Sequence, residues 1–177
     1  MSNVINSIRY KGEVTVQTVD KNKRVIKEVH SHNEGCSPLF EFLINCLARK
    51  YSSELVPNFI RCFYQATNNP EDLNQNILSS LGHYQARVSK VESVNNESFS
   101  VTYSFFIPNN SFRKIETGNV VATVALYNNA NADITYIQNP SAIVTLPNPI
   151  TAENIKNEED VIILWKLTLG NYEEQLL

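Results

Sequence analysis

The fold turns on residues 30–47, where strand-like sequence ends and the one convincing long helix begins. Their sequence is His-Ser-His-Asn-Glu-Gly-Cys-Ser-Pro-Leu-Phe-Glu-Phe-Leu-Ile-Asn-Cys-Leu. Asn33 and Gly35 tolerate positive φ and predict a sharp turn. Pro38 suits the first position of a helix, where a missing N–H costs nothing. The apolar stripe of this helix consists of Leu39, Phe40, Leu43, Ile44, Cys46 and Leu47. Its spacing predicts an amphipathic helix from about 38 to 51 that covers a sheet.

Short strand-like segments make up most of the remaining chain. Residues 98–107 place apolar side chains at every second position, a pattern that buries one face of a strand and exposes the other. In residues 83–94 the apolar parity changes, which predicts a β-bulge near Ser89 and Lys90. Strands are predicted at residues 8–19, 24–30, 59–67, 83–94, 98–107, 120–127, 134–137, 142–146 and 161–169.

A series of about eight or nine short strands, separated by residues that favour turns, predicts a mainly-β fold. We expect an antiparallel, jelly-roll-like β-sandwich with the helix on its sheet. A chain of 177 residues is most simply one domain, residues 1–177. Pro147 and Pro149 follow the strand at 142–146 and are expected to prevent a long ladder there.

Two segments are apolar on both faces and are expected to be covered central strands. They are residues 120–127 and residues 161–169, in which Trp165 is expected to fill the core. In residues 59–67, apolar side chains alternate with Arg61 and Gln65, as in a short strand.

Composition excludes several classes of protein. The hydrophobic fraction is 42%, the charged fraction 19% and the net charge −3, which argues against a dedicated nucleic-acid binder. No secretory signal and no apolar run of the ~18 residues needed to span a bilayer is visible. The three cysteines cannot all pair with one another, so free thiols in a reducing compartment are expected.

His30 and His32 form the most suggestive candidate for chemistry. They are two residues apart, so on a strand both imidazoles face one side, as a metal site requires. Cys36 or Glu34 is the candidate third ligand, and Cys36 at a helix N-terminus would also be a candidate for an activated thiol. The alternative interpretation is a polar strand end with a small apolar residue in the turn. The sequence has no Gly-x-Ser-x-Gly elbow and no phosphate-binding glycine loop, and it predicts no cofactor.

The densest basic cluster lies at the tip of the first predicted hairpin. Its members are Lys21, Lys23, Arg24 and Lys27. Phosphate contact is one interpretation, and protection of a strand edge against unwanted pairing is the other.

Several large side chains that the alternating core pattern does not assign to the core are candidates for a subunit interface. Two polar loops, residues 68–81 and 108–118, are further candidate contacts. The tail ends in an apolar dipeptide that suits docking on a neighbour. The interface candidates are Tyr64, Phe106, Phe112, Tyr127, Tyr172, Leu176 and Leu177.

Three segments carry a resemblance to a known group of proteins. They are the His-Asn-x-Gly turn with its following helix (residues 32–47), Val-Ala-Leu-Tyr-Asn (124–128) and Ile-Leu-Trp-Lys-Leu-Thr-Leu (163–169). Together they resemble small collar, tail or baseplate proteins of tailed bacteriophages, including crAss-like phages. The resemblance implies a scaffold without catalytic residues. Glu34-Gly35-Cys36 departs from it, because small residues are expected at this turn.

We therefore expect a non-enzymatic virion component that forms a homo-oligomeric ring in the head–tail or tail assembly. Such a ring needs heterologous contacts and other virion proteins as neighbours. The alternative is a ligand- or carbohydrate-binding β-sandwich module with a receptor-binding role. A third hypothesis is a metal-dependent enzyme at His30, His32 and Cys36. Membrane contact and direct nucleic-acid binding are not expected, and the expected location is the virion, after assembly in the host cytoplasm.

Overall fold

Antiparallel strands dominate the computed structural model of this chain, which confirms the predicted mainly-β class. The structure describes residues 9–35, 44–45, 48, 57–69, 73, 83–94, 99–111, 118–127, 140–152 and 159–170. They contain β1 (Arg9–Val19), β2 (Val25–Gly35), β3 (Phe59–Phe63), β4 (His83–Val94), β5 (Phe99–Ile107), β6 (Asn119–Tyr127), β7 (Ala142–Thr151), β8 (Asp160–Gly170) and the 3-10 turn η2 (Asn109–Ser111).

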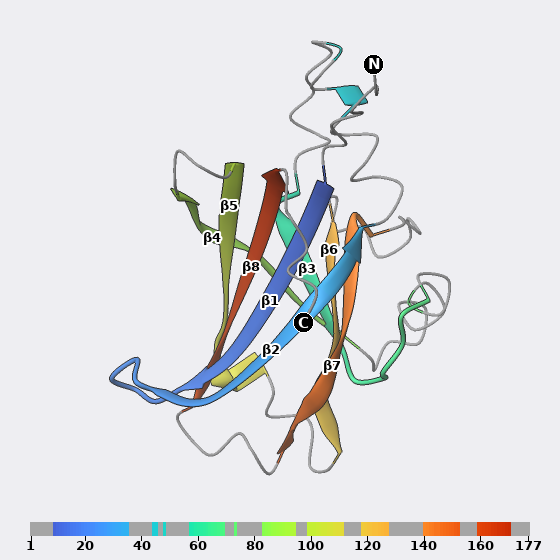
Figure 1. The fold of residues 1–177 in the computed structure, drawn as a ribbon. Coiled ribbons are helices and arrows are strands. Elements are labelled where there is room, and N and C mark those ends of the chain that lie inside the picture. Colours follow the sequence, from blue (N-terminus) through green and yellow to red (C-terminus); the bar gives the residue numbers. More distant parts are fainter. Residues whose placement is uncertain are drawn as a thin grey trace, which may run out of the picture.

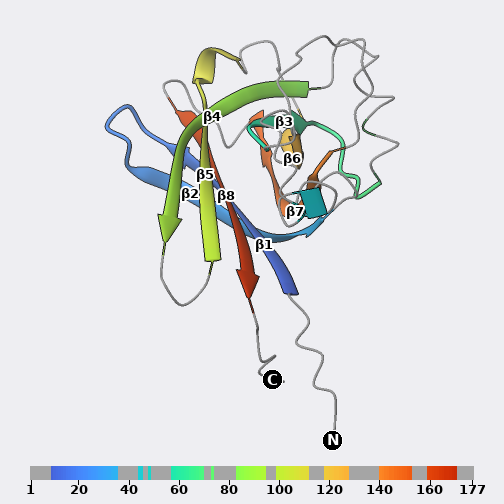
Figure 2. The same ribbon diagram turned by 90° about the horizontal axis from the view of Figure 1, so that it is seen from above.

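The strands close into a barrel in the order β1-β2-β7-β6-β3-β4-β5-β8, and every neighbouring pair is antiparallel. Sheet A contains β1, β8 and β5, and sheet B contains β7, β6 and β3 (Figure 1). Strands β2 and β4 take part in both sheets, and Figure 2 shows β4 curving from one to the other. Strand β5 lies between β4 and β8. The antiparallel sheets are therefore as predicted, and the finer, jelly-roll-like arrangement stays a prediction.

The passage of β4 between the sheets coincides with a bulge. Val88 pairs with Phe105 and Lys90 pairs with Ser104, so Ser89 is an extra residue on β4. The bulge predicted near Ser89 and Lys90 is therefore confirmed. An extra residue bends a strand and increases its twist, which lets β4 pair first with β3 and then with β5.

Inward-facing side chains fill the barrel. The alternation predicted for residues 98–107 is confirmed at Tyr103, Phe105 and Ile107, which are all buried. Trp165 is fully buried, as predicted. Other members of this core are Val14, Val16, Val29, Ile60, Cys62, Val124, Leu126, Val144, Leu146, Ile150, Val161, Ile163 and Leu167. A barrel of about eight strands has an interior just wide enough for such packing.

The outer face of sheet B is buried as well. A second apolar cluster lies there, formed by side chains of opposite parity to those of the barrel core. It consists of Phe59, Phe63, Leu73, Ala125, Tyr127 and Ile143. Strand β6 is therefore covered on both faces, as its apolar sequence at residues 120–127 predicted.

The predicted turn at Asn33 and Gly35 is wrong, because β2 continues through both residues. Asn33 lies opposite Gly12 on β1, and Gly35 lies opposite Ala142 on β7. The Asn33 side chain occupies the space that a Cβ atom on Gly12 would need. Because Gly12 has no side chain, the Asn33 side chain fits on the inner face of the barrel. A larger residue at position 12 would take up the same space.

Most of the helix predicted at 38–51 lies outside the described residues, which include only Ile44, Asn45 and Ala48 of it. The N–H of Ala48 donates to the carbonyl oxygen of Ile44 at 2.9 Å, which is one helical turn. Ile44 is 65% exposed, so its assignment to a buried stripe is wrong. The strand predicted at 134–137 also lies outside the described part of the chain.

Strand β7 is longer than the predicted 142–146. Its ladder with β6 is interrupted between Thr145 and Ile150, the stretch that holds Pro147 and Pro149. Proline has no N–H to donate to a neighbouring strand, so the ladder is interrupted at Pro147 and Pro149, as predicted.

Gly12→Ala is expected to destabilise the fold by about 1–3 kcal/mol, because the new methyl group needs volume that Asn33 already fills. Urea denaturation of the purified protein measures this change in the free energy of unfolding. Asn33→Ala should make room, so Gly12→Ala should cost less in the Asn33→Ala background. Additive costs in the double variant would contradict the close approach.

Candidate functional site

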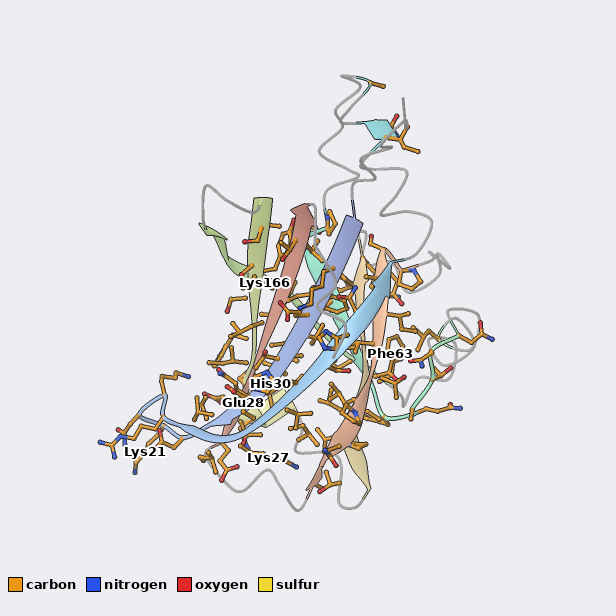
Figure 3. The ribbon with its side chains drawn as sticks, in the orientation of Figure 1. Lys21, Lys27, Glu28, His30, Phe63 and Lys166 are labelled. Carbon is orange, nitrogen blue, oxygen red and sulfur yellow. The ribbon has the colours of Figure 1, made fainter. Side chains whose placement is uncertain are left out.

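The two histidines proposed as metal ligands lie on the outer surface of β2. Both are exposed and share one face, as their spacing predicted. The ring of His30 has partners at both nitrogens: Nδ1 lies 3.0 Å from Thr15 Oγ1, and Nε2 lies 2.7 Å from Glu28 Oε1 (Figure 3). No group of three or more His, Cys, Asp or Glu in the described part of the chain could hold a metal ion. Cys36 lies outside the described residues.

A shallow hollow of about 300 Å³ lies over β1, β2, β5 and β8 on the outer face of sheet A. Glu13 lies in it, with its carboxylate 3.0 Å from Lys11 Nζ and 3.8 Å from Lys166 Nζ. Burial alone would raise the pKa of Glu13, but the Lys11 hydrogen bond and the nearby cations lower it overall. The hollow is lined by Glu13, Val14, Thr15, His30, Ser31, His32, Thr102, Leu164 and Lys166. This lining contains no Phe, Tyr or Trp on which a sugar ring could stack.

The interface candidates divide into three groups. Phe106 on β5 is 38% exposed, and Tyr64 after β3 is half-buried. Tyr127 is only 2% exposed, because it belongs to the second apolar cluster on sheet B. Its prediction as an interface residue is therefore wrong. The remaining candidates lie outside the described residues; they are Phe112, Tyr172, Leu176 and Leu177.

Arg61 lies beside two aromatic residues of the second cluster. It is 4% exposed, and its guanidinium carbon lies 5.6 Å from the Phe59 ring centre and 5.0 Å from the Tyr127 ring centre. Within the described residues, Nε and Nη1 of Arg61 have no hydrogen-bond partner. Contact with two aromatic faces offsets only part of the cost of burying a charge.

The hairpin between β1 and β2 projects beyond the barrel (Figure 1). We call residues 20–27 the β-arm. At its tip the Asp20 carboxylate oxygen Oδ1 accepts hydrogen bonds from the N–H groups of Asn22 at 2.8 Å and Arg24 at 2.9 Å. Lys23 adopts φ 61° and donates its N–H to the Asp20 carbonyl oxygen at 2.9 Å. The Asp20 side chain thus holds the tip in one conformation.

Two aliphatic side chains of the β-arm are exposed. Val25 is 50% exposed and Ile26 is 54% exposed. Val19 pairs with Val25 while Thr18 pairs with Lys27, so Ile26 is an extra residue in the ladder. The sequence showed the hairpin and its cations. It did not show this exposure, because apolar residues in a strand are normally assigned to a core.

Lys23 ties the β-arm to the barrel. Its Nζ donates to Asp160 Oδ2 at 2.8 Å and lies 4.2 Å from the centre of the Phe106 ring. The other Asp160 oxygen accepts the N–H of Asn109 at 3.0 Å. Burial alone would raise the pKa of Asp160, but the Lys23 hydrogen bond, the Asn109 N–H and the Lys23 charge lower it overall.

No family model, curated protein or solved structure matches this chain. Within the described residues, no helix has the length and apolar character needed to cross a membrane.

Lys23→Met is expected to lower the free energy of unfolding at pH 7 by at most about 1 kcal/mol, because it removes a partly exposed ion pair. The folded pKa of Asp160 lies below its ordinary value of 3.8. The ion pair therefore stabilises the fold above that value, and its contribution is lost as the pH falls through the folded pKa.

Denaturant unfolding between pH 7 and pH 3 should show the gap between wild type and Lys23→Met narrowing toward acid. Arg24→Met removes a cation of the same arm that does not bind Asp160, and it serves as the control. A gap that stays constant over this range would contradict the proposed role of Asp160.

Arg61→Met is expected to leave stability unchanged or to raise it by about 1–2 kcal/mol, because it removes a buried charge and keeps the length of the side chain. Urea denaturation measures the change, with Arg61→Ala as the cavity-forming control. A loss of more than about 2 kcal/mol in Arg61→Met would instead indicate an anion that binds the guanidinium.

Proposed function

We propose that this protein is a non-enzymatic structural component of a bacteriophage virion. In this proposal it is a ring-forming protein of the collar, tail or head–tail assembly, with heterologous contacts between its copies and further contacts to other virion proteins. The phage-like segments at residues 124–128 and 163–169 favour this class of protein. Its location in the proposal is the assembled particle.

The observation that carries the proposal is the β-arm. A hairpin that projects from the barrel, exposes adjacent aliphatic side chains and is braced by Asp20 within its tip and by Lys23 against the barrel suits contact with a neighbour. Ordering a flexible loop on binding costs free energy, and a braced hairpin avoids much of this cost. An enzyme or small-molecule receptor does not require such an element.

A ring also requires a second, different contact surface on each subunit. Phe106 lies beside the Lys23 side chain of the β-arm, so it extends the same surface. Tyr64 follows β3 on the other sheet and is half-buried, which makes it a candidate for the second surface.

A ligand-binding module is the second candidate function, and the hollow over sheet A favours it. The side chains of Glu13, Lys166 and His32 offer both acceptors and donors to a polar ligand. Titration of the protein with a glycan panel, with Lys166→Gln as the matched variant, tests this function. Binding that the variant abolishes would support it over the structural role.

Purified phage particles are expected to contain the protein in a fixed number of copies, as a ring component must be. Quantitative mass spectrometry of the particles and negative-stain imaging of the recombinant protein measure copy number and ring formation. The protein's absence from particles, together with a monomer in solution, would contradict the structural role.

A further inference from the structure

The β-arm concentrates positive charge on a chain that is otherwise acidic. Its eight residues carry four cations and one carboxylate, a net charge of +3. The whole chain has a net charge of −3, so the other residues together carry −6. The Asp20 carboxylate is engaged by backbone N–H groups of the arm itself. Lys23 is already paired with Asp160, and the arm and the rest of the chain carry net charges of opposite sign.

Protection of a strand edge does not account for this composition. Within the described residues, β2 pairs with β7 only at Glu34 and Gly35, so the arm does leave an edge of β2 without a neighbouring strand. Lys21 and Arg24, however, lie in the turn and not along that edge, and Val25 and Ile26 are exposed apolar side chains. Exposed aliphatic groups beside cations are typical of a surface that another molecule covers.

The geometry of the arm favours contact through side chains over strand addition. The extra residue Ile26 breaks the regular ladder, and a bulge disfavours pairing of a further strand at that edge. The Lys23 side chain, which reaches from the turn to Asp160 and Phe106, holds the tip of the arm against the barrel. The arm thus presents Val25, Ile26 and its cations in a preorganised form.

We infer that the β-arm of one copy docks on a second copy of this chain, at a surface outside the arm. This inference rests on the proposed ring-forming function and specifies its contact. Two arms would repel each other, so the arm contacts a different surface of its partner, and in a ring this contact is heterologous. A heterologous contact repeats from copy to copy and closes into a ring when the rotation permits.

Sedimentation velocity of the full-length protein over a range of concentrations tests this contact. Wild type should self-associate, and Val25→Ser/Ile26→Ser and Arg24→Glu should each weaken association at least about tenfold. Lys11→Gln removes one exposed cation outside the arm and should change association less than about twofold. A rise in salt from about 0.05 to 0.5 M should weaken wild-type association, because the attraction is partly electrostatic.

A mixing experiment identifies the direction of the contact. An Arg24→Glu copy has a defective arm but an intact partner surface, so it should cap wild-type assemblies and reduce their average size. An arm-to-arm contact would leave the wild-type assemblies unchanged by this variant. Circular dichroism of each variant, matching that of wild type, shows that the fold is retained.

Three results would overturn the inference. They are a wild-type protein that stays monomeric at about 100 μM, association that the arm variants leave unchanged, and an arm that binds anionic vesicles or DNA while the protein stays monomeric. Assemblies that form without the arm would leave the proposed ring function standing. Absence from phage particles would remove that function itself.

Discussion

The pairing of β1 with β8 is the interaction on which the barrel depends. The two strands come from opposite ends of the described chain, and every residue of β1 has a partner on β8. Without β8, both β1 and β5 would lose a neighbour, and their backbone N–H and C=O groups would need other partners. β8 also supplies Trp165, the largest fully buried side chain of the core. Closure and packing therefore depend on one strand.

Sequence patterns predicted the elements whose environment follows from local alternation. The strict alternation of β5 and the two apolar faces of β6 each have one structural explanation, and both predictions are confirmed. The turn at Asn33 and Gly35 failed for a non-local reason. Both residues have turn propensity, but the deciding contact is with Gly12 on another strand, and no local pattern in residues 30–47 contains it.

The exposure of the site residues could be predicted only in part, because alternation along a strand assumes one buried face and one exposed face. Sheet B is buried on both faces, so Arg61 and Tyr127 are covered although alternation places them outside the barrel. The β-arm lies beyond the barrel, so its aliphatic residues have no core to join. The cations of the arm were visible in the sequence, whereas the exposure of Val25 and Ile26 depends on where the barrel ends. His30 and His32 do share a face, as expected.

The register of β1 and β8 has a practical consequence. Arg9 lies opposite Gly170, so both strands reach the same rim of the barrel. The β-arm follows Val19 at the other end of β1, which at 11 residues spans about 35 Å. A fluorescent domain or affinity tag fused near either position would stand clear of the arm. A short linker that joins the two positions would also make this chain a natural candidate for circular permutation, with new ends opened in a surface loop.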